Sequence, residues 1–298
     1  MEKLIEKKMS LDEKRALINA RLSELVPETS KEHALLFESA RYSLLGGGKR
    51  LRPLLMLSVT EAYGLDCTYG LDAACVLEMI HTYSLIHDDL PCMDDDDLRR
   101  GQPTLHKKVG EAIALLAGDY LLTHSFEVLS KMADVSSDKK VALIQNLAKA
   151  GGGFGMIGGQ VMDMESECKR KLSLEELNVL HQKKTGALII CSLLFGGILA
   201  DAKDADLQIL LNFGRCLGAV FQIIDDVIDV TESTSTLGKT ALSDVSNNKL
   251  TYVSLLGVEK SLEKAKEYQT EGLKYLDEMS IDTESLRLIA DSFITRKC

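Results

Sequence analysis

The placement of the prolines is the feature that most limits what this chain can fold into. Its four prolines are Pro27, Pro53, Pro91 and Pro103, so the sequence beyond residue 103 contains none. A long proline-free stretch rich in Leu, Ala, Lys and Glu favours helices packed in series. Aromatic residues make up only 5% of the chain, tryptophan is absent, and the alternating patterns typical of strands are scarce. The sequence therefore predicts an all-α fold.

Local signals place the helix boundaries. The segments Ser10–Glu13 and Ser173–Glu176 have the pattern of capping boxes. We expect Ser30 to open a helix that ends at Gly46, and Pro53 to lie in the first turn of the next helix. Further helices are predicted over roughly residues 71–89, 108–133, 138–150, 174–200, 204–230, 259–279 and 284–296.

No linker, repeat or low-complexity segment divides the 298 residues. The glycine clusters at residues 151–153 and 158–159 are expected to be helix breaks or places where helices approach closely. Hydrophobic residues make up 45% of the chain, which is enough for a sizeable core. Because one large helical domain can reach this length, we predict a single domain over residues 1–298.

The charge balance argues against two classes of partner. With 35 basic and 45 acidic residues, the formal net charge is −10. Such a chain gains little from the counterion release that drives nucleic-acid binding, and an anionic membrane surface repels it. The most apolar stretch, Gly186–Ala200, would be about 22 Å long as a helix, short of the ~30 Å hydrocarbon core. We therefore expect a buried core helix, no nucleic-acid partner and no stable membrane association.

The cysteines and the N-terminus bear on the cellular compartment. The seven cysteines are odd in number, and no pair has CxxC spacing. This pattern favours reduced thiols, mostly buried, and makes a zinc site improbable. The N-terminal sequence MEKLIEKKMSLDEKR mixes both charge signs and has no apolar core of a signal peptide. We expect a cytoplasmic location.

Two acidic clusters each end a strongly apolar stretch. The first begins at Asp88 and reads DDLPCMDDDD, and the second begins at Asp225 and reads DDVID. Asp225 and Asp229 are four residues apart and share one helix face. Asp88 and Asp94 are six apart, which is about 240° around a regular helix. A break at Pro91 would swing Asp94 back toward Asp88.

Crowded carboxylates need a counter-charge. Mg²⁺ supplies one, and it commonly bridges carboxylates to phosphates. For Asp95–Asp97 alone, a solvated acidic loop or a weak Ca²⁺ site is the simpler interpretation. Two such clusters on two helices favour a catalytic metal site instead, and the DxDxDG pattern of an EF-hand is absent.

Basic residues accompany both clusters. The segment Gly46–Pro53, GGGKRLRP, joins flexible backbone, cations and a helix N-terminus, which suits an anion; no GK[ST] follows, so a Walker A loop is excluded. His81 precedes Asp88 by seven residues and lies on nearly the same helix face, where a phosphate contact is favoured. Taken singly, each basic residue fits an ordinary surface charge. The others are Arg99 and Arg100, Lys183 and Lys184 at the expected start of the apolar helix, and Lys239 and Lys249.

These motifs resemble a known family. GGGKRLRP, HTYSLIHDDLPCMDDDDLRRGQPT, KKTGALI, FQIIDDVIDVT, LGKT and NNKLTY occur in the order found in bacterial-type trans-isoprenyl diphosphate synthases, from about Phe37 to Ser254. The nearest members are farnesyl and geranylgeranyl diphosphate synthases. The resemblance implies an all-α isoprenoid-synthase-type bundle around a deep central cavity, a homodimer, and Mg²⁺ as cofactor with Mn²⁺ as an alternative ion.

The resemblance also implies residue roles. Isopentenyl diphosphate would contact Lys49, Arg52, His81 and Arg100. The allylic diphosphate would contact Arg99, Lys184, Thr185, Gln222, Lys239 and Lys249, with Gln160 and Asp163 close by. The metal would be held by Asp88, Asp94 and Asp225, with Asp89, Asp226 and Asp229 supporting or joining them.

The implied reaction is ionisation of an allylic diphosphate, attack by isopentenyl diphosphate and loss of a proton. The metal, Arg99, Lys184 and Lys239 would stabilise the departing diphosphate. A non-catalytic prenyltransferase subunit would carry damaged acidic motifs, whereas both are intact here. A terpene cyclase would carry an Asn/Ser/Glu-type second motif and would lack GGGKRLRP.

Product length is expected to depend on the helix that ends at Asp88. Tyr83 and Ser84 lie about one turn before Asp88, where a growing tail would pass. Ser84 is too small to block it, whereas Tyr83 is bulky and rigid. In the family, an aromatic residue here together with the two-residue insertion in the first motif goes with fifteen carbons. The sequence thus predicts farnesyl diphosphate as the main product, with geranylgeranyl diphosphate as the alternative. The simpler interpretation of Tyr83 is that it only packs against a neighbouring helix and that the cavity floor lies deeper.

Overall fold

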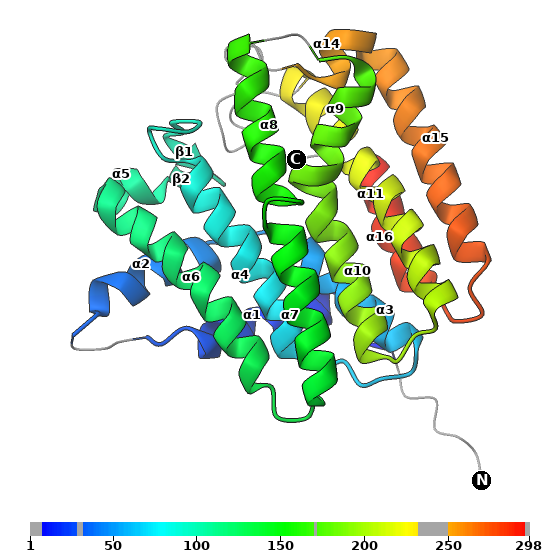
Figure 1. The fold of residues 1–298 in the computed structure, drawn as a ribbon, viewed down its shortest axis with the longest axis horizontal. Coiled ribbons are helices and arrows are strands. Elements are labelled where there is room, and N and C mark those ends of the chain that lie inside the picture. Colours follow the sequence, from blue (N-terminus) through cyan, green and yellow to red (C-terminus); the bar gives the residue numbers. More distant parts are fainter. Residues whose placement is uncertain (1–7, 29–31, 170–171, 232–249, 296–298) are drawn as a thin grey trace.

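The computed structural model describes residues 8–28, 32–169, 172–231 and 250–295 of the chain (Figure 1). Over these residues it is almost entirely helical, and the only strands form one short two-stranded hairpin. The all-α prediction is confirmed. The elements are α1 (Leu11–Leu25), α2 (Ala34–Leu45), α3 (Leu51–Ala62), α4 (Leu71–Asp88), β1 (Leu98–Arg99), β2 (Gln102–Pro103), α5 (Leu105–Val109), α6 (Glu111–Lys131), α7 (Ser137–Gly151), α8 (Met156–Lys169), α9 (Leu174–His181), the π-helical turn η1 (Gln182–Gly186), α10 (Ala187–Leu199), α11 (Asp204–Thr231), α14 (Tyr252–Leu256), α15 (Val258–Asp277) and α16 (Glu284–Ile294).

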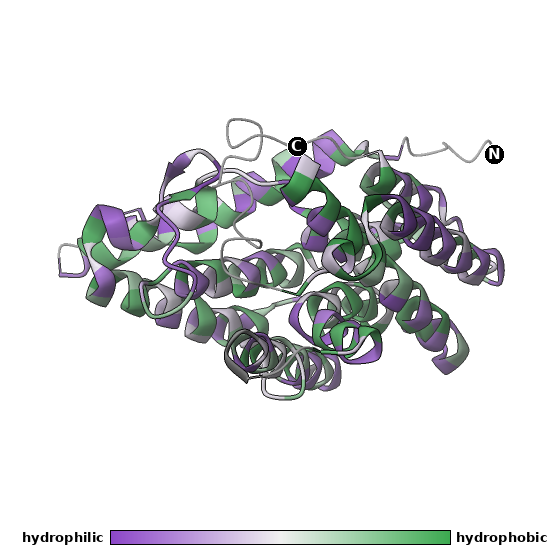
Figure 2. Ribbon diagram, turned by 90° about the horizontal axis from the view of Figure 1, so that it is seen from above, coloured by the Kyte–Doolittle hydropathy of each residue, from purple (hydrophilic) through white to green (hydrophobic). Residues whose placement is uncertain are grey.

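The core lies where α3, α4, α10 and α11 pack together. Helix α4 packs against α6, α10 packs against both α3 and α11, and α15 covers α11 (Figure 1). One connected set of buried apolar residues runs through these helices. Figure 2 shows hydrophobic and hydrophilic residues alternating along most helices, with hydrophilic residues at the outer edges of the bundle. Burial of these apolar faces therefore holds α4 and α11, which end in the two acidic motifs.

Both capping boxes form as predicted. In α1, the Ser10 hydroxyl accepts from the Glu13 N–H while the Glu13 carboxylate accepts from the Ser10 N–H. Ser173 and Glu176 do the same at the start of α9. Pro53 lies in the first turn of α3, also as predicted. Ser30 is outside the described residues, and α2 begins after His33.

Glycines explain several boundaries that the sequence placed wrongly. The helix expected over residues 108–133 begins at Glu111, because Gly110 has φ +85° and separates it from α5. Helix α8 was not predicted, since Gly158 and Gly159 lie within it. Gly159 lets α8 approach η1 closely, because a Cβ at this position would lie 2.3 Å from the backbone nitrogen of Lys184. The expectation of a close helix approach at this cluster is confirmed.

The apolar helix is longer than the fifteen residues of its most apolar stretch. Residues Leu174–Leu199 run without a break in helical conformation, and this stretch, Glu111–Lys131 and Asp204–Thr231 each have the length and composition of a membrane-spanning helix. Length alone therefore does not distinguish this helix from a membrane span, contrary to the expectation from its fifteen most apolar residues. In the bundle, 56% of the window in Leu174–Leu199 is buried, and α10 packs between α3 and α11.

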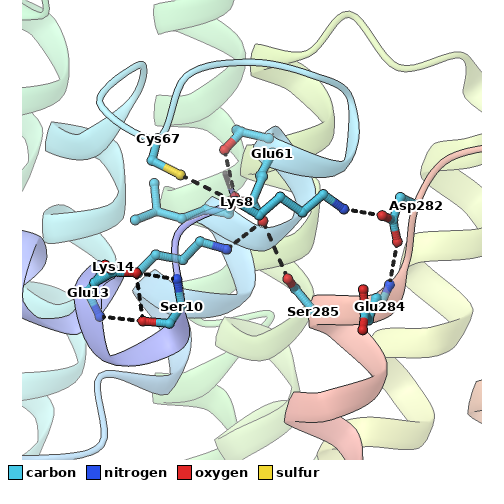
Figure 3. A network of polar contacts seen from close by, with 11 residues as sticks. Lys8, Ser10, Glu13, Lys14, Glu61, Cys67, Asp282, Glu284 and Ser285 are labelled. Atoms are coloured by element: carbon cyan, nitrogen blue, oxygen red, sulfur yellow. Dashed lines mark hydrogen bonds and ion pairs between the residues drawn. The ribbon is translucent and has the colours of Figure 1, made fainter. Parts of the chain in front are cut away.

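A buried ion pair ties the N-terminal helix to the rest of the bundle. The Lys14 ammonium of α1, fully buried, donates to Glu61 Oε2 of α3 at 2.6 Å. Cys67 and Ser285 also donate to the Glu61 carboxylate, at 3.7 and 3.4 Å (Figure 3). Nearby, Lys8 pairs with Asp282. The network therefore joins α1, α3 and α16.

Of the five described cysteines, all are free, and all but Cys92 are buried. Burial raises the pKa of the Cys67 thiol to about 11. This agrees with the expectation of mostly buried thiols. Cys298 and the side chain of Cys168 lie outside the described part of the structure.

Candidate active site

The first acidic motif breaks its helix as predicted. Helix α4 ends at Asp88, and the chain then turns so that the Asp94 N–H donates to the Asp88 carbonyl at 2.8 Å. Two further backbone bonds, from Met93 and Asp95 to the Leu90 carbonyl, close the same turn at 2.8 and 3.2 Å. The turn therefore brings Asp94 back to Asp88, although six residues separate them.

A hairpin then returns two arginines to the helix end. Strands β1 and β2 pair antiparallel, and the residues at their turn, Arg100 and Gly101, have φ of 54° and 75°. Positive φ at both central residues is typical of a type I′ turn. Arg99 Nε donates to Asp89 Oδ1 at 2.6 Å, and Arg99 also donates to Asp96 at 3.2 Å. Burial raises the pKa of Asp89 to about 6, although Arg99 acts in the opposite direction.

The tip of this hairpin meets the glycine segment. Arg100 donates to the Gly47 carbonyl. Gly47 and Gly48 have φ of 93° and 127°, which side-chain-bearing residues rarely adopt. A Cβ on Gly48 would also lie 2.9 Å from the Arg100 guanidinium. The glycine motif and the arginine motif, some fifty residues apart in sequence, therefore form one surface, with the exposed Lys49 beside it.

The cations behind this surface are desolvated. Arg52 is 7% exposed, and its Nε has no hydrogen-bond partner among the described residues. Burial lowers the pKa of Arg52 to about 10, although Glu78 acts in the opposite direction; Arg100 adds to the lowering. Burial also lowers the pKa of His81 well below its usual range, and Arg52, Arg100 and Arg99 add to this effect. Two arginines therefore lie close together beside a neutral histidine, and Glu78 is the carboxylate that favours the charge of both. Such a cluster suits an anionic ligand.

The second acidic motif is held by a chain of hydrogen bonds. Thr185 Oγ1 donates to Gln222 Oε1 at 3.0 Å, and Gln222 Nε2 donates to Asp226 Oδ1 at 2.9 Å. The Tyr252 N–H donates to Asp226 Oδ2 at 2.8 Å. Asp226 and Asp229 are both 2% exposed, whereas Asp225 is half-buried. Asp226 therefore positions the motif and links it to Tyr252. The sequence contained the signal for this anchor in the Thr-Tyr pair of NNKLTY, but no role was assigned to it.

Lys184 and Thr185 do not open a helix, contrary to expectation. They lie in η1, a π-helical turn inside the continuous run of α9 and α10. Glycines flank the turn: a Cβ on Gly159 would clash with Lys184, and one on Gly218 would lie 2.9 Å from Gly186. The Lys184 ammonium donates to Asp163 Oδ2 at 2.5 Å. Such turns occur frequently at functional sites because they re-aim side chains.

The residues expected to limit product length lie on α4. Tyr83 is 4% exposed, and its ring meets the His87 ring edge to face, with centroids 5.7 Å apart. Burial raises the pKa of Tyr83 to about 12, and the nearby Asp88 adds to this. Its hydroxyl has no hydrogen-bond partner among the described residues. The Ser84 hydroxyl donates a hydrogen bond to the His81 carbonyl at 2.9 Å. Lys239 and Lys249 lie outside the described residues.

The donor set suits a hard divalent cation shared with a ligand. In the described part of the chain, no three Asp, Glu, His or Cys side chains are gathered as a ready-made metal cage. Mg²⁺ usually binds one or two carboxylates together with substrate phosphates and water, and does not need such a cage. Asp88 and Asp94, joined by the turn, and Asp225 on α11 fit this mode of binding.

Comparison with known proteins agrees with this arrangement. The polyprenyl synthetase family matches residues 33–282. The chain is 46% identical to the farnesyl diphosphate synthase of Bacillus subtilis (strain 168), covering 88% of both proteins. It is 45% identical to the chloroplastic geranylgeranyl pyrophosphate synthase of Capsicum annuum, covering 91% of this chain and 73% of that one. A Helicobacter pylori geranyltransferase, solved with magnesium and isoprenyl diphosphate, superposes with a TM-score of 0.84 at 36% identity, covering 97% and 98% of the chains.

The chain therefore belongs to the polyprenyl synthetase family, and it is a trans-prenyltransferase. The family predicted from the sequence motifs is confirmed.

Proposed function

We propose that this enzyme condenses isopentenyl diphosphate with dimethylallyl and then geranyl diphosphate, and that farnesyl diphosphate is its main product. The observation that carries this proposal is the group formed by buried Arg52, half-buried His81 and exposed Arg100 beside the end of α4. These residues, with Lys49, would bind the diphosphate of isopentenyl diphosphate. The nearby Asp88 end of the same helix would place the second substrate within reach.

We assign the allylic diphosphate to the region between α4, η1 and α11. The proposed contacts in this region are Arg99, Lys184, Thr185 and Gln222. Lys239 and Lys249 are proposed to complete the binding site. Asp88, Asp94 and Asp225 would hold Mg²⁺, which supplies positive charge to the departing diphosphate; Asp89, Asp226 and Asp229 orient their neighbours or join them. We extend the proposal to Mn²⁺ as a substitute ion. The released diphosphate is the proposed acceptor of the proton.

Tyr83 is the proposed floor of the chain-length cavity. It is buried one turn before Asp88, and its ring packs on His87 of the same helix. The deep cavity itself stays a prediction. Geranylgeranyl diphosphate is the second candidate product, because several curated relatives, including that of Capsicum annuum, are geranylgeranyl pyrophosphate synthases.

Product analysis tests the proposal. Purified enzyme is incubated with Mg²⁺, isopentenyl diphosphate and each allylic diphosphate in turn, and the products are identified by mass spectrometry. We expect fifteen carbons from wild type and longer chains from Tyr83→Ala. Tyr120→Ala, which removes an aromatic ring packed on Phe37 and His124, is the control and should leave the product unchanged. A twenty-carbon product from wild type would overturn the farnesyl assignment.

We also propose a homodimer. Helix α8 and the loop before it expose four apolar side chains at helical spacing, Phe154, Ile157, Val161 and Met164, at 85, 46, 52 and 43%. Such a stripe supports association with another apolar face. Val161→Asp should shift the mass measured by light scattering from two chains to one, and an unchanged mass would exclude this face.

We further propose a cytoplasmic location, which the free thiols of the described cysteines support.

A further inference from the structure

Arg50 lies within the glycine-rich motif, yet its side chain points away from the proposed ligand. The segment Gly46–Lys49 is exposed, whereas Arg50, directly after it, is 2% exposed. Its guanidinium makes three hydrogen bonds of 2.8 Å each: to the Leu44 carbonyl, to Glu78 Oε1 and to Asn19 Oδ1. Each of its three nitrogens thus donates to a protein group, and burial of the side chain keeps the guanidinium from a ligand in solvent.

The three bonds come from three different helices. Leu44 lies in the last turn of α2, and Arg50 is the cap residue of α3, so the bond between them joins the two ends of the glycine segment. Glu78 of α4 and Asn19 of α1 then fix the guanidinium from two further sides. A segment with three glycines has unusually many conformations to lose on ordering. A side chain that ties both of its ends reduces that loss before any ligand binds.

The backbone at Arg50 shows the same constraint. Its φ is 51°, in the left-handed region that side-chain-bearing residues rarely adopt. The buried pair with Glu78, whose side chains are 1% and 2% exposed, holds the residue there. Arg52 stands two residues later, in the first turn of the helix that begins directly after Arg50.

We propose that Arg50, held by Glu78 and Asn19, is a positioning residue that closes the glycine segment so that Lys49 and Arg52 are presented to isopentenyl diphosphate. The proposal rests on the proposed function, because it requires that substrate at this surface. Arg50 itself does not touch the substrate. Loss of the clamp should weaken isopentenyl diphosphate binding and leave the allylic site, proposed between α4, η1 and α11, unaffected.

Arg50→Lys tests the clamp, because lysine keeps the charge but cannot make the three forked bonds. We expect the KM for isopentenyl diphosphate to rise by roughly tenfold or more, with the KM for geranyl diphosphate and kcat within about twofold. Arg41→Lys is the matched control. Arg41 also donates to backbone carbonyls, those of Ser23 and Val26 at 2.7 and 2.6 Å, but it does not span the glycine segment. It should lower Tm without moving either KM.

Two further measurements make the result decisive. Asn19→Ala removes only one of the three bonds, and it should raise the same KM by a smaller factor even if Arg50→Lys does not fold. Calorimetric titration of isopentenyl diphosphate alone reads binding without turnover. A Kd that shifts equally in Arg50→Lys, Asn19→Ala and Arg41→Lys, or in none of them, would overturn the clamp. Absence of any condensation product from wild type would instead contradict the proposed function.

Discussion

Lys14 and Arg52 are both buried cations, but their surroundings differ. Lys14 is fully buried, and its ammonium lies 2.6 Å from the Glu61 carboxylate within the network of Figure 3. Arg52 is nearly as buried, yet its Nε has no hydrogen-bond partner in the part of the chain that the structure describes. Burial and Arg100 act against its charge, whereas Glu78, which is hydrogen-bonded to Arg50, favours it from a distance.

Whether a buried cation has its own carboxylate distinguishes a residue that holds the fold together from one that is available to a ligand. A buried cation with its own carboxylate is complete in the folded chain and fixes one helix against another. A buried cation that lacks a partner is costly unless an anion arrives. Lys14 therefore belongs to the framework that joins α1 to α3, whereas Arg52 is the residue that we propose to bind a diphosphate. Substitutions in the two regions should act on different measured quantities.

The largest effect is expected on stability at the framework pair. Glu61→Ala leaves the Lys14 charge buried without its carboxylate, and it should lower the free energy of unfolding by about 3–5 kcal/mol. The double variant Lys14→Met/Glu61→Ala should be more stable than Glu61→Ala, because no buried charge is left over. Urea unfolding measures both. A loss below about 1 kcal/mol for Glu61→Ala would remove the distinction.

Removal of a proposed metal ligand should act on turnover instead. Asp225→Ala is expected to lower kcat by about 10²–10³-fold, because charge stabilisation of the departing diphosphate is lost. A chelator should abolish wild-type activity, and added Mg²⁺ should restore it. The control Asp282→Ala removes a carboxylate from the framework network, where it pairs with Lys8, and should leave kcat unchanged. Near-wild-type turnover of Asp225→Ala would show that the second motif is only a helix end.

Arg52→Ala should act on one substrate. Loss of a charged hydrogen bond of about 1.5–3 kcal/mol corresponds to a KM for isopentenyl diphosphate roughly 10–100 times higher. The free energy of unfolding should not fall, because no bond to Arg52 Nε is lost in the free enzyme. Arg21→Ala, which breaks an ion pair with Asp72 at 2.6 Å, is the control with intact kinetics. If Arg52→Ala lowered the free energy of unfolding and left the KM for isopentenyl diphosphate unchanged, Arg52 would be a structural residue like Lys14.

The smallest effect concerns pH. Burial lowers the pKa of His81 below its usual value near 6.5, so the folded enzyme binds fewer protons than the unfolded chain in acid. The stability that neutral His81 provides is complete above pH 6.5 and is lost as the pH falls below it, by less than about 1.4 kcal/mol for each pH unit. In His81→Gln, the decline in Tm between pH 6.5 and 5 should be shallower. Identical slopes would show that His81 does not titrate in this range.

Much of this site could be predicted from the sequence, because its parts are local. Pro91 and the six-residue spacing of Asp88 and Asp94 require a turn, and the backbone bond between those aspartates forms it. Apolar periodicity marked the long helices. The break at Gly110 was missed because the helical pattern continues on both sides of it, and only φ +85° reveals the separation.

The remainder depends on contacts between segments distant in sequence. The π-helical turn at Lys184 is accommodated by Gly159 and Gly218 on other helices, and no local pattern signals such packing. Arg50 stands between Lys49 and Arg52 in GGGKRLRP, and no local pattern signals its bonds to Asn19 and Glu78. The fold class and the family were therefore accessible from the sequence, whereas the packing that holds Arg50 and the π-helical turn was not.

Thermal unfolding of the enzyme with isopentenyl diphosphate tests the comparison most directly. Without an allylic substrate no turnover occurs, so any shift in Tm reports binding. At a concentration of 100 times Kd, a ligand that binds only the folded state stabilises it by about 2.7 kcal/mol. We predict this stabilisation for wild type and for Glu61→Ala, whose framework is weakened but whose site is intact, and little or none for Arg52→Ala at the same concentration. Equal stabilisation of Arg52→Ala and wild type would contradict the assignment of the buried arginine to the substrate.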